Sequence, residues 1–502
     1  MPKIASYTSL GFISLNRGNG KPLHRQLYEA LRREILGGQL KPGTRLPPTR
    51  ALANEMGVAR NTISNAYKQL LAEGYVESRV GSGTHVTHTL PDRILQVEGG
   101  EQVFGQPTAS DELDNQKPRL SERGTAVSQL PYQWEKIQPR AFTSTMPGVD
   151  VFPFKLWEKL LVSSWRSLSS NQLGYQSAMG YRPLREAIAT YLQTARGVRC
   201  TANQVIITNG TQQALNTITQ LLLNKEDKAW VENPSYNGIK AALRGTLATM
   251  IPVRVDSEGL VVQEGLQKAP KARLAFISPS HQYPLGVTMS LMRRIELLQW
   301  AQDERAWVIE DDYDSEFRYA GYPISALQGL DTAGRVIYVG TFSKVLFPAL
   351  RIGYMVVPTR LVEPFHAARA HMDRGVTLLE QVVLTTFINE GHFARHIRKM
   401  RLLYEERRDI FVQAAGNYLA GLVNVESSAA GLHVVGWLPD GANDVAVSQK
   451  LLEHGIDAPP VSAFALEPIA RQGLVFGYGV VGEKEILTAV KKMRHILGKH
   501  LA

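Results

Sequence analysis

The stretch at residues 341–354, TFSKVLFPALRIGY, decides the fold and the chemistry of the larger part of this chain. It places Lys344 in a small polar turn directly after the apolar run RVIYVG. An apolar run that ends in such a turn predicts a buried strand with the lysine at its end. The hydroxyls of Thr341 and Ser343 stand beside this lysine, and Arg351 follows it by seven residues. A lysine in this setting can form a Schiff base next to a phosphate that the hydroxyls and the arginine hold.

Other apolar runs nearby also end in polar or glycine-rich turns. They are QVIITNG, KAWVENP, RLAFISP and AWVIEDDY, and stretches with helical spacing such as TQQALNTITQLLL separate them. Strands that alternate with helices predict an α/β fold with a mostly parallel sheet, whose ligands bind at the carboxyl ends of the strands. We expect a small α+β subdomain at the C-terminal end of the same domain.

The turns after these runs carry an anion cradle and an aromatic ring. In TNGTQQAL a strand passes into a helix, so the backbone N–H groups of Gly210, Thr211 and Gln212 are free to hold a phosphate. Tyr236 follows the next run, in VENPSY, where its ring can stack on a flat cofactor.

A carboxylate and a phenol complete this set of residues. Asp311 ends the run in WVIEDDY, and Tyr313 follows two residues later. The carboxylate can keep a pyridine nitrogen protonated, and the phenol can bond an oxygen on the same ring. Lys344 follows Asp311 by 33 residues. Each feature alone has an ordinary explanation, such as a solvated lysine or a helix cap, but together they predict pyridoxal 5′-phosphate. No metal site is predicted.

Positive charge is concentrated in the first part of the chain. Residues 1–88 hold 12 lysines and arginines against 5 acidic residues, within a net charge of +10 over 502 residues. A basic domain joined to a nearly neutral body indicates a polyanionic partner. On charge alone, a solvated basic face explains the pattern equally well.

The hydrophobic spacing of the same segment predicts three helices and a hairpin. The first helix has an apolar stripe from Leu23 to Ile35, the second has Thr49 as its N-cap, and the third ends at Gly74. YVESR and THV are strand-like runs around a glycine turn. This order predicts a winged helix-turn-helix, with donors for the major groove at the start of the third helix and arginines for phosphates. The predicted DNA-binding residues are Arg45, Arg50, Arg60, Asn61, Thr62, Ser64 and Gly81.

The remaining composition limits the class of protein. No run of 18 or more apolar residues is present, the N-terminus lacks the apolar core of a signal peptide, and Cys200 is the single cysteine. These features predict a cytoplasmic protein with no intrachain disulfide and no membrane partner. Residues 89–135 are rich in Gly, Pro, Gln, Ser and acidic residues, which predicts a flexible linker between domains at 1–88 and 136–502.

The segment PGTRLPPTRALANEMGVARNTISNAYKQLLAEGYVESRVGSGT resembles the GntR family of bacterial regulators. The resemblance implies that Arg50, Arg60, Thr62 and Gly81 touch DNA. Some relatives carry a further arginine on the recognition helix where this chain has Ser64, so the operator sequence stays open.

The part of the chain after the linker resembles the fold-type I aminotransferases. SPSHQYPLGVTMS, EDDYDSEFRY and TFSKVLFPALRIGY are typical of the MocR subfamily, which joins a GntR-type domain to an aminotransferase-like domain. The resemblance implies that Lys344 forms the Schiff base, Asp311 holds the pyridine nitrogen and Tyr313 bonds the ring oxygen. It also implies that Tyr175, in YQSAMGYRPLREAIATYL, reaches the cofactor phosphate of the neighbouring subunit in a homodimer.

Two departures from working aminotransferases bear on activity. Enzymes with the motif NPxG use its asparagine at the cofactor oxygen, whereas this chain has YPLG with Tyr283 in that place. Enzymes also hold the substrate carboxylate with an arginine, and the aligned residue here is Val475, with Arg471 nearby as a possible substitute.

These features predict a transcription regulator that senses a small amine, an amino compound or pyridoxal phosphate itself. Two other functions stay open. One is a working aminotransferase with an autoregulatory DNA-binding domain, which sustained turnover with an amino donor and a 2-oxo acid would support. The other is a DNA-binding protein whose second domain is only a dimerisation scaffold. The presence of Lys344, Asp311, Tyr313 and Arg351 together argues against a scaffold.

Overall fold

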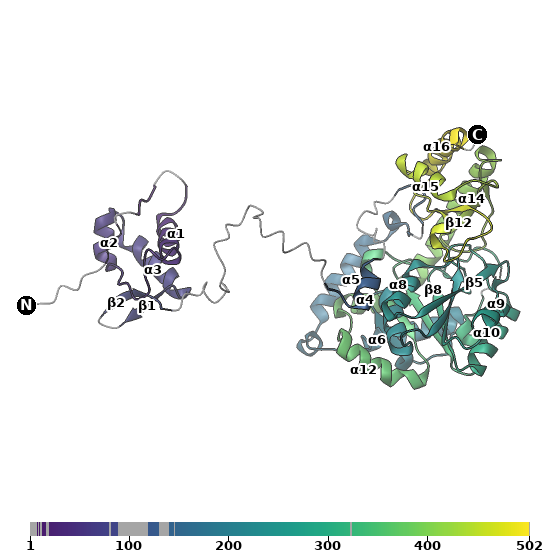
Figure 1. The fold of residues 1–502 in the computed structure, drawn as a ribbon, viewed down its shortest axis with the longest axis horizontal. Helices are drawn as coiled ribbons and strands as arrows, with labels where there is room; N and C mark the ends of the chain where they lie inside the picture. Colours follow the sequence, from purple (N-terminus) through teal and green to yellow (C-terminus); the bar gives the residue numbers. More distant parts are fainter. Residues whose placement is uncertain are drawn as a thin grey trace, which may run out of the picture. The chain divides into compact units, whose positions relative to one another are not determined.

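The computed structural model contains two compact units, one within Met1–Lys117 and one within Pro118–Ala502. The residues that it describes are 8, 10, 13–16, 20–79, 82–88, 119–129, 140–144, 146–321 and 324–500. Figure 1 shows the helices and strands of both units, coloured along the sequence. None of the helices in those ranges is both long enough and apolar enough to cross a membrane.

The first unit is a helical core with a two-stranded wing. Its elements are α1 (Leu23–Leu36), α2 (Thr49–Met56), α3 (Arg60–Ala72), β1 (Val76–Arg79) and β2 (Gly83–Val86). Leu27, Leu31 and Ile35 of α1 belong to one buried cluster with Ile63 and Leu70 of α3. β1 and β2 pair antiparallel. The predicted winged helix-turn-helix is confirmed.

Local conformation sets both ends of α2. Gly57 follows this helix with a φ of 61°, in the left-handed region that glycine favours, and so turns the chain towards α3. The predicted N-cap at Thr49 is wrong, because Pro48 occupies that position and Thr49 is the first helical residue. The Thr49 hydroxyl instead accepts a hydrogen bond from Arg60 Nε at 3.3 Å.

The second unit is built on a sheet of eight strands. They are β3 (Val205–Thr208), β4 (Lys228–Asn233), β5 (Thr249–Asp256), β6 (Gly259–Leu260), β7 (Leu274–Ile277), β8 (Trp307–Asp312), β9 (Val336–Thr341) and β10 (Gly353–Val356). Their order across the sheet is β3-β10-β9-β8-β7-β4-β5-β6. The run from β9 to β5 is parallel, whereas β10 pairs antiparallel with both β3 and β9. The predicted α/β fold with a mostly parallel sheet is confirmed.

Helices lie around this sheet (Figure 1). They are α5 (Phe154–Ser167), α6 (Arg182–Arg196), α7 (Thr211–Leu222), α8 (Asn237–Thr246), α9 (Val262–Lys268), α10 (Leu291–Asp303), α11 (Leu327–Leu330), α12 (Val362–Met372) and α13 (Leu378–Asn389). Every residue of β7, β8 and β9 is buried, as expected for parallel strands covered on both faces. The polar residues at the ends of these strands therefore border a dry core.

A smaller lobe follows at the C-terminal end of the chain. Its elements are α14 (His392–Tyr418), β11 (Asn424–Val425), β12 (His433–Trp437), α15 (Asp444–Glu453), β13 (Gly473–Gly477) and α16 (Glu483–His500). β12 pairs antiparallel with β11 and β13 in a sheet of its own. This lobe, at the yellow end of the colour scale in Figure 1, is the predicted α+β subdomain.

A short helix, α4 (Glu122–Ser128), lies inside the segment predicted to be a flexible linker. The Ser121 hydroxyl caps it by accepting a backbone N–H bond of 3.0 Å. Glu122 forms an ion pair with Lys225 at 2.9 Å, and α4 packs against α8. The prediction of a flexible linker over residues 89–135 is therefore wrong at this helix, which belongs to the second unit and is ordered by its cap and by its packing against α8.

Candidate functional site

The turn that carries Lys344 lies at the carboxyl ends of neighbouring parallel strands. β9 ends at Thr341, three residues before the lysine, and Asp311 is the last but one residue of β8 beside it. β7 comes next in the sheet and leads into the loop with His281 and Tyr283. Parallel strands finish at one edge of a sheet, so residues from distant parts of the sequence meet here.

Burial controls the charge of Lys344. The pKa of the ammonium group is lowered from 10.5 to about 8, mainly by burial and also by Arg351, although the carboxylates of Asp314 and Asp311 act in the opposite direction. An amine with a pKa near 8 is neutral in an appreciable fraction of molecules at neutral pH. Neutrality is what a nucleophilic amine requires.

Asp311 lies in a dry and acidic environment. The pKa of its carboxyl group is raised from 3.8 to about 7, mainly by burial, with Asp312 and Asp314 also raising it and Lys344 lowering it. Its Oδ1 atom is buried and has no hydrogen-bond partner among the described residues. An unpaired buried acceptor costs about 1–3 kcal/mol, so a donor on a bound molecule would stabilise this position.

An anion cradle lies at the start of α7. Gly210 precedes the helix with a φ of 81°, and Thr211 and Gln212 form its first turn. The Arg351 guanidinium lies against this glycine, because a Cβ there would come within 3.1 Å of Nη2. The same Nη2 atom donates to the Asn209 carbonyl oxygen at 2.9 Å. A helix N-terminus with an adjacent arginine suits an anion such as phosphate.

Two hydroxyl groups stand beside the lysine. The Ser343 N–H donates to Thr341 Oγ1 at 3.1 Å and so shapes the turn. The Ser343 Oγ atom is buried and lacks a hydrogen-bond partner in the part of the chain that the structure describes. This hydroxyl is therefore available to a bound phosphate.

Three tyrosines gather around the same strand ends. The ring of Tyr283 lies 6.4 Å from that of Tyr236 and 6.0 Å from that of Tyr313, and both pairs meet edge to face. Burial raises the pKa of Tyr236 to about 12 and also raises those of Tyr283 and Tyr313. All three phenols therefore stay protonated at neutral pH and can donate hydrogen bonds.

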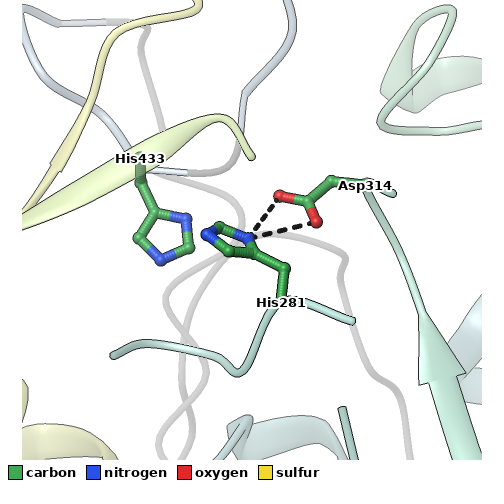
Figure 2. Close-up of side chains that lie close together, drawn as sticks. All are labelled: His281, Asp314 and His433. Atoms are coloured by element: carbon green, nitrogen blue, oxygen red, sulfur yellow. Dashed lines mark hydrogen bonds and ion pairs between the residues drawn. The ribbon is translucent and has the colours of Figure 1, made fainter. Parts of the chain in front are cut away.

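Three buried residues of the site, His281, Asp314 and His433, are absent from the predicted site residues (Figure 2). His281 Nδ1 lies 3.1 and 3.2 Å from the Asp314 carboxylate oxygens and 3.1 Å from the Tyr313 hydroxyl. The His433 ring lies 5.0 Å from that of His281, and ligand atoms of the two histidines and the aspartate lie within 4.8 Å of one another. Asp314 stands in a motif that the sequence already singles out. No local signal connects β12, which carries His433, to this loop.

A buried ion pair supports β8 behind the site. Arg196 Nη2 lies 2.8 Å from Asp312 Oδ2, and neither side chain is more than 7% exposed. The guanidinium also donates to Ser280 Oγ and to the Ile324 carbonyl oxygen, both at 2.8 Å. The Tyr338 hydroxyl donates to Asp312 at 2.6 Å. These bonds connect the end of α6 to the loops on both sides of β8.

Three residues that the sequence analysis names do not belong to the group of side chains around Lys344. They are Tyr175, Val475 and Arg471. Tyr175 is 91% exposed, and the Arg374 guanidinium lies 5.5 Å from its ring. Val475 is fully buried in β13, so an apolar core residue stands where aminotransferases are expected to have an arginine. Arg471 is exposed and its guanidinium lies 4.4 Å from the Trp437 ring.

The predicted DNA-reading residues of the first unit lie at the start of α3. Arg60 and Asn61 begin this helix with exposed side chains, and Thr62 and Ser64 are half-buried behind them. The first turn has no acidic residue and no side-chain cap. Its free N–H groups and its positive end therefore suit a phosphate or the edge of a base.

The predicted phosphate-binding residues lie on α2 and before it. Arg50 is exposed on α2. Arg45 packs against the wing, because a Cβ on Gly83 would come within 3.2 Å of its Nε atom. The predicted wing contact Gly81 lies outside the described residues.

Comparison with known proteins matches the two units separately. Residues 23–86 match the bacterial regulatory proteins of the gntR family. Residues 154–474 match aminotransferase class I and II.

Several proteins that are similar over more than nine tenths of this chain are named as regulators. The probable rhizopine catabolism regulatory protein MocR of Rhizobium meliloti is 39% identical over 96% of this chain and 94% of that relative. The HTH-type pyridoxine biosynthesis transcriptional regulator PdxR of Corynebacterium glutamicum is 29% identical over 93% of this chain and 94% of its own. The solved kynurenine aminotransferase of Pyrococcus horikoshii, in complex with PMP, matches with a TM-score of 0.71 and 27% identity, over 78% of this chain and 100% of that one.

Proposed function

This chain belongs to the MocR subfamily of GntR-type transcription regulators, and we propose that it binds operator DNA with its winged helix-turn-helix and responds to a small amine at a pyridoxal 5′-phosphate site around Lys344. One observation carries the proposal. A half-buried lysine with a lowered pKa lies with Asp311, Tyr313 and Arg351 at one edge of the sheet, and the other unit of the chain exposes the start of a recognition helix.

The residues at the strand ends fit this cofactor in three respects. Asp311 offers a buried, unpaired oxygen to a pyridine nitrogen. Ser343 Oγ, the N-terminus of α7 and Arg351 suit the phosphate. Tyr236 offers a protonated phenol and a ring for stacking. The similar aminotransferase structure contains PMP, which is the amine form of the same cofactor.

The residues of this chain provide the two states that a switch needs. Pyridoxal phosphate, when bound, supplies an aldehyde that combines with primary amines. When no effector is present, Lys344 would hold the cofactor through its amino group, and Asp311 would keep the pyridine nitrogen protonated. An effector amine that takes the place of Lys344 releases its side chain, so the lysine changes charge and position with occupancy. Such a local change can bias the geometry in which a dimer presents its DNA-binding units.

The pKa of Lys344 predicts how cofactor attachment depends on pH. The lysine is protonated below a pH of about 8 and neutral above it, because burial lowers its pKa from 10.5. The rate of covalent attachment is expected to rise about tenfold per pH unit below that value and to level off above it. Stopped-flow absorbance after mixing apoprotein with pyridoxal phosphate measures this profile. A rate that continues to rise until the pH reaches the ordinary lysine pKa would contradict the buried assignment.

Arg60 is the residue whose loss tests the DNA interface most directly. Arg60→Ala is expected to weaken operator binding by about 1–3 kcal/mol if the guanidinium reads a base. Fluorescence anisotropy with a fragment from upstream of the gene measures the change. Arg25→Ala, which removes an exposed arginine from α1, is the matched control and should change affinity little. Unchanged binding in both variants would place the recognition surface elsewhere.

The proposal includes a homodimer and assigns DNA binding and effector binding to two different domains of the chain. Exposed Tyr175 is proposed to complete the phosphate site of a second copy. Residues 1–88 are proposed as the DNA-binding domain and residues 136–502 as the effector domain, and α4, in the segment between them, packs against α8 of the effector domain. A regulator of this kind acts on the chromosome, which places it in the cytoplasm.

One titration separates amine sensing from the alternatives. Protein loaded with pyridoxal phosphate is titrated with amines, amino acids and 2-oxo acids while operator binding is followed in parallel. An absorbance shift that accompanies a change in DNA affinity, without turnover, supports amine sensing. A response to added cofactor alone indicates that pyridoxal phosphate is the effector. Repeated cycling with an amino donor and an oxo acid indicates an aminotransferase, and the absence of any cofactor band contradicts the proposal.

A further inference from the structure

Two buried histidines beside Lys344 each have one ring nitrogen without a partner. His281 is 2% exposed and His433 is 0% exposed. His281 Nε2 and His433 Nδ1 make no hydrogen bond to any described residue, and therefore none to each other. Buried polar atoms are nearly always paired, so two unpaired atoms in one cluster point to a missing occupant.

The partners of His281 Nδ1 and His433 Nε2 determine whether the other two ring nitrogens, His281 Nε2 and His433 Nδ1, donate or accept a hydrogen bond. His281 Nδ1 faces the Asp314 carboxylate, and His433 Nε2 lies 2.9 Å from the Pro284 carbonyl oxygen. The carboxylate and the carbonyl are both acceptors, so we assign the ring hydrogens to these two nitrogens, and the Tyr313 hydroxyl 3.1 Å from His281 Nδ1 then accepts as well. In a neutral imidazole the other nitrogen is then an acceptor. Burial and the neighbouring His281 lower the pKa of His433 to about 3, which keeps that ring neutral.

The pair lies where the large sheet and the small lobe meet. His281 belongs to the loop after β7, and His433 belongs to β12. Figure 2 shows the His281 ring between Asp314 and His433, with its Nε2 edge turned towards His433. The charge of Lys344 also lowers the pKa of His433, so the reactive amine lies close to the pair.

We propose that His281 Nε2 and His433 Nδ1 form an acceptor pair that receives a hydrogen-bond donor, a hydroxyl or a second amino group, from the amine effector. This inference rests on the proposed function, because it concerns the amine that replaces Lys344. Two lone pairs attract a donor and repel the oxygens of a carboxylate. Val475 stands where enzymes are expected to hold a carboxylate with an arginine. Both features favour an amino alcohol or a diamine over an amino acid.

A series of three-carbon amines tests this choice on the wild-type protein loaded with pyridoxal phosphate. The probes are propylamine, aminopropanol, diaminopropane and β-alanine, and binding is followed by absorbance and by calorimetry. Aminopropanol, diaminopropane or both are expected to bind at least about tenfold more tightly than propylamine, because a site built to pair with a donor discriminates against its absence. β-Alanine is expected to bind no better than propylamine. The two donor probes distinguish a hydroxyl from an amino group.

A variant that keeps an aromatic ring tests which atoms cause the preference for amines with a second hydrogen-bond donor. His433→Phe removes the acceptor and keeps an aromatic ring, so the ratio of affinities between donor-bearing amines and propylamine should fall to about one. His454→Phe, at the exposed end of α15, is the control and should keep the full preference. The wild-type series decides the matter alone if His433→Phe does not fold.

Each contrary outcome has a distinct meaning. Equal affinity for all four amines, or a preference for β-alanine, overturns the acceptor pair and leaves amine sensing intact. Failure of every amine to bind overturns both proposals. If chelator treatment abolishes the preference and Zn²⁺ binds wild type but not His433→Phe, the pair is a metal site and the donor proposal is wrong.

Discussion

Lys344→Ala is expected to abolish covalent attachment of pyridoxal phosphate completely, and with it every response of DNA binding to an added amine. The physical reason is that Lys344 lies half-buried in the turn after β9, near Asp311, where its lowered pKa of about 8 supplies a neutral nucleophile. Absorbance of the dialysed protein measures attachment, and operator binding with and without amine measures the response. The variant should bind operator DNA itself, because the winged helix-turn-helix lies in the other unit.

Lys240 provides a demanding control for this prediction. It is a buried lysine whose pKa burial also lowers to about 8, but it lies on α8 and donates to the Phe464 carbonyl oxygen. Lys240→Met should therefore retain the attached cofactor. If Lys344→Ala keeps a normal cofactor band, or if Lys240→Met loses it, the assignment of Lys344 is wrong. This comparison tests whether cofactor attachment requires a lysine at the end of the strand or only a lysine with a lowered pKa.

The largest loss of stability is expected at the buried pair behind the site. Arg196→Met should lower the free energy of unfolding of the second unit by about 3–5 kcal/mol, because it leaves the Asp312 carboxylate buried without its counterion. The pair is at most 7% exposed, with Nη2 and Oδ2 2.8 Å apart. Urea unfolding followed by tryptophan fluorescence measures the change.

Arg182 offers a matched comparison on the same helix. It forms an exposed ion pair with Glu186 at 2.8 Å, and Arg182→Ala should cost only about 0.5 kcal/mol or less. The double variant Arg196→Met, Asp312→Leu should recover much of the loss, since no buried charge then lacks a partner. A loss in Arg196→Met no larger than that in Arg182→Ala would show that the buried network does not support β8.

Local patterns were sufficient to predict most of the strands that carry the site. The runs around β3, β4, β7, β8 and β9 are short, apolar and followed by turn residues, and all five form strands. Such runs predict burial because a parallel strand covered on both faces needs apolar residues throughout. Antiparallel β10 was not predicted, since RIGYMVV also suits a loop or a buried turn. The ordered helix α4 was missed because its stability comes from Ser121 and from contacts with distant residues.

The sequence by itself determined the two-domain architecture, the strand-end position of Lys344 and Asp311, and the motifs that connect the chain to its family. These are consequences of hydrophobic period and turn chemistry, which act over a few residues. Only the tertiary structure decided that His433 of β12 meets His281 and Asp314, that Ser343 and Asp311 keep unpaired atoms, and how far burial moves the pKa of Lys344. Those properties depend on desolvation and on contacts between segments more than 100 residues apart, as between His281 and His433, and no local pattern encodes them.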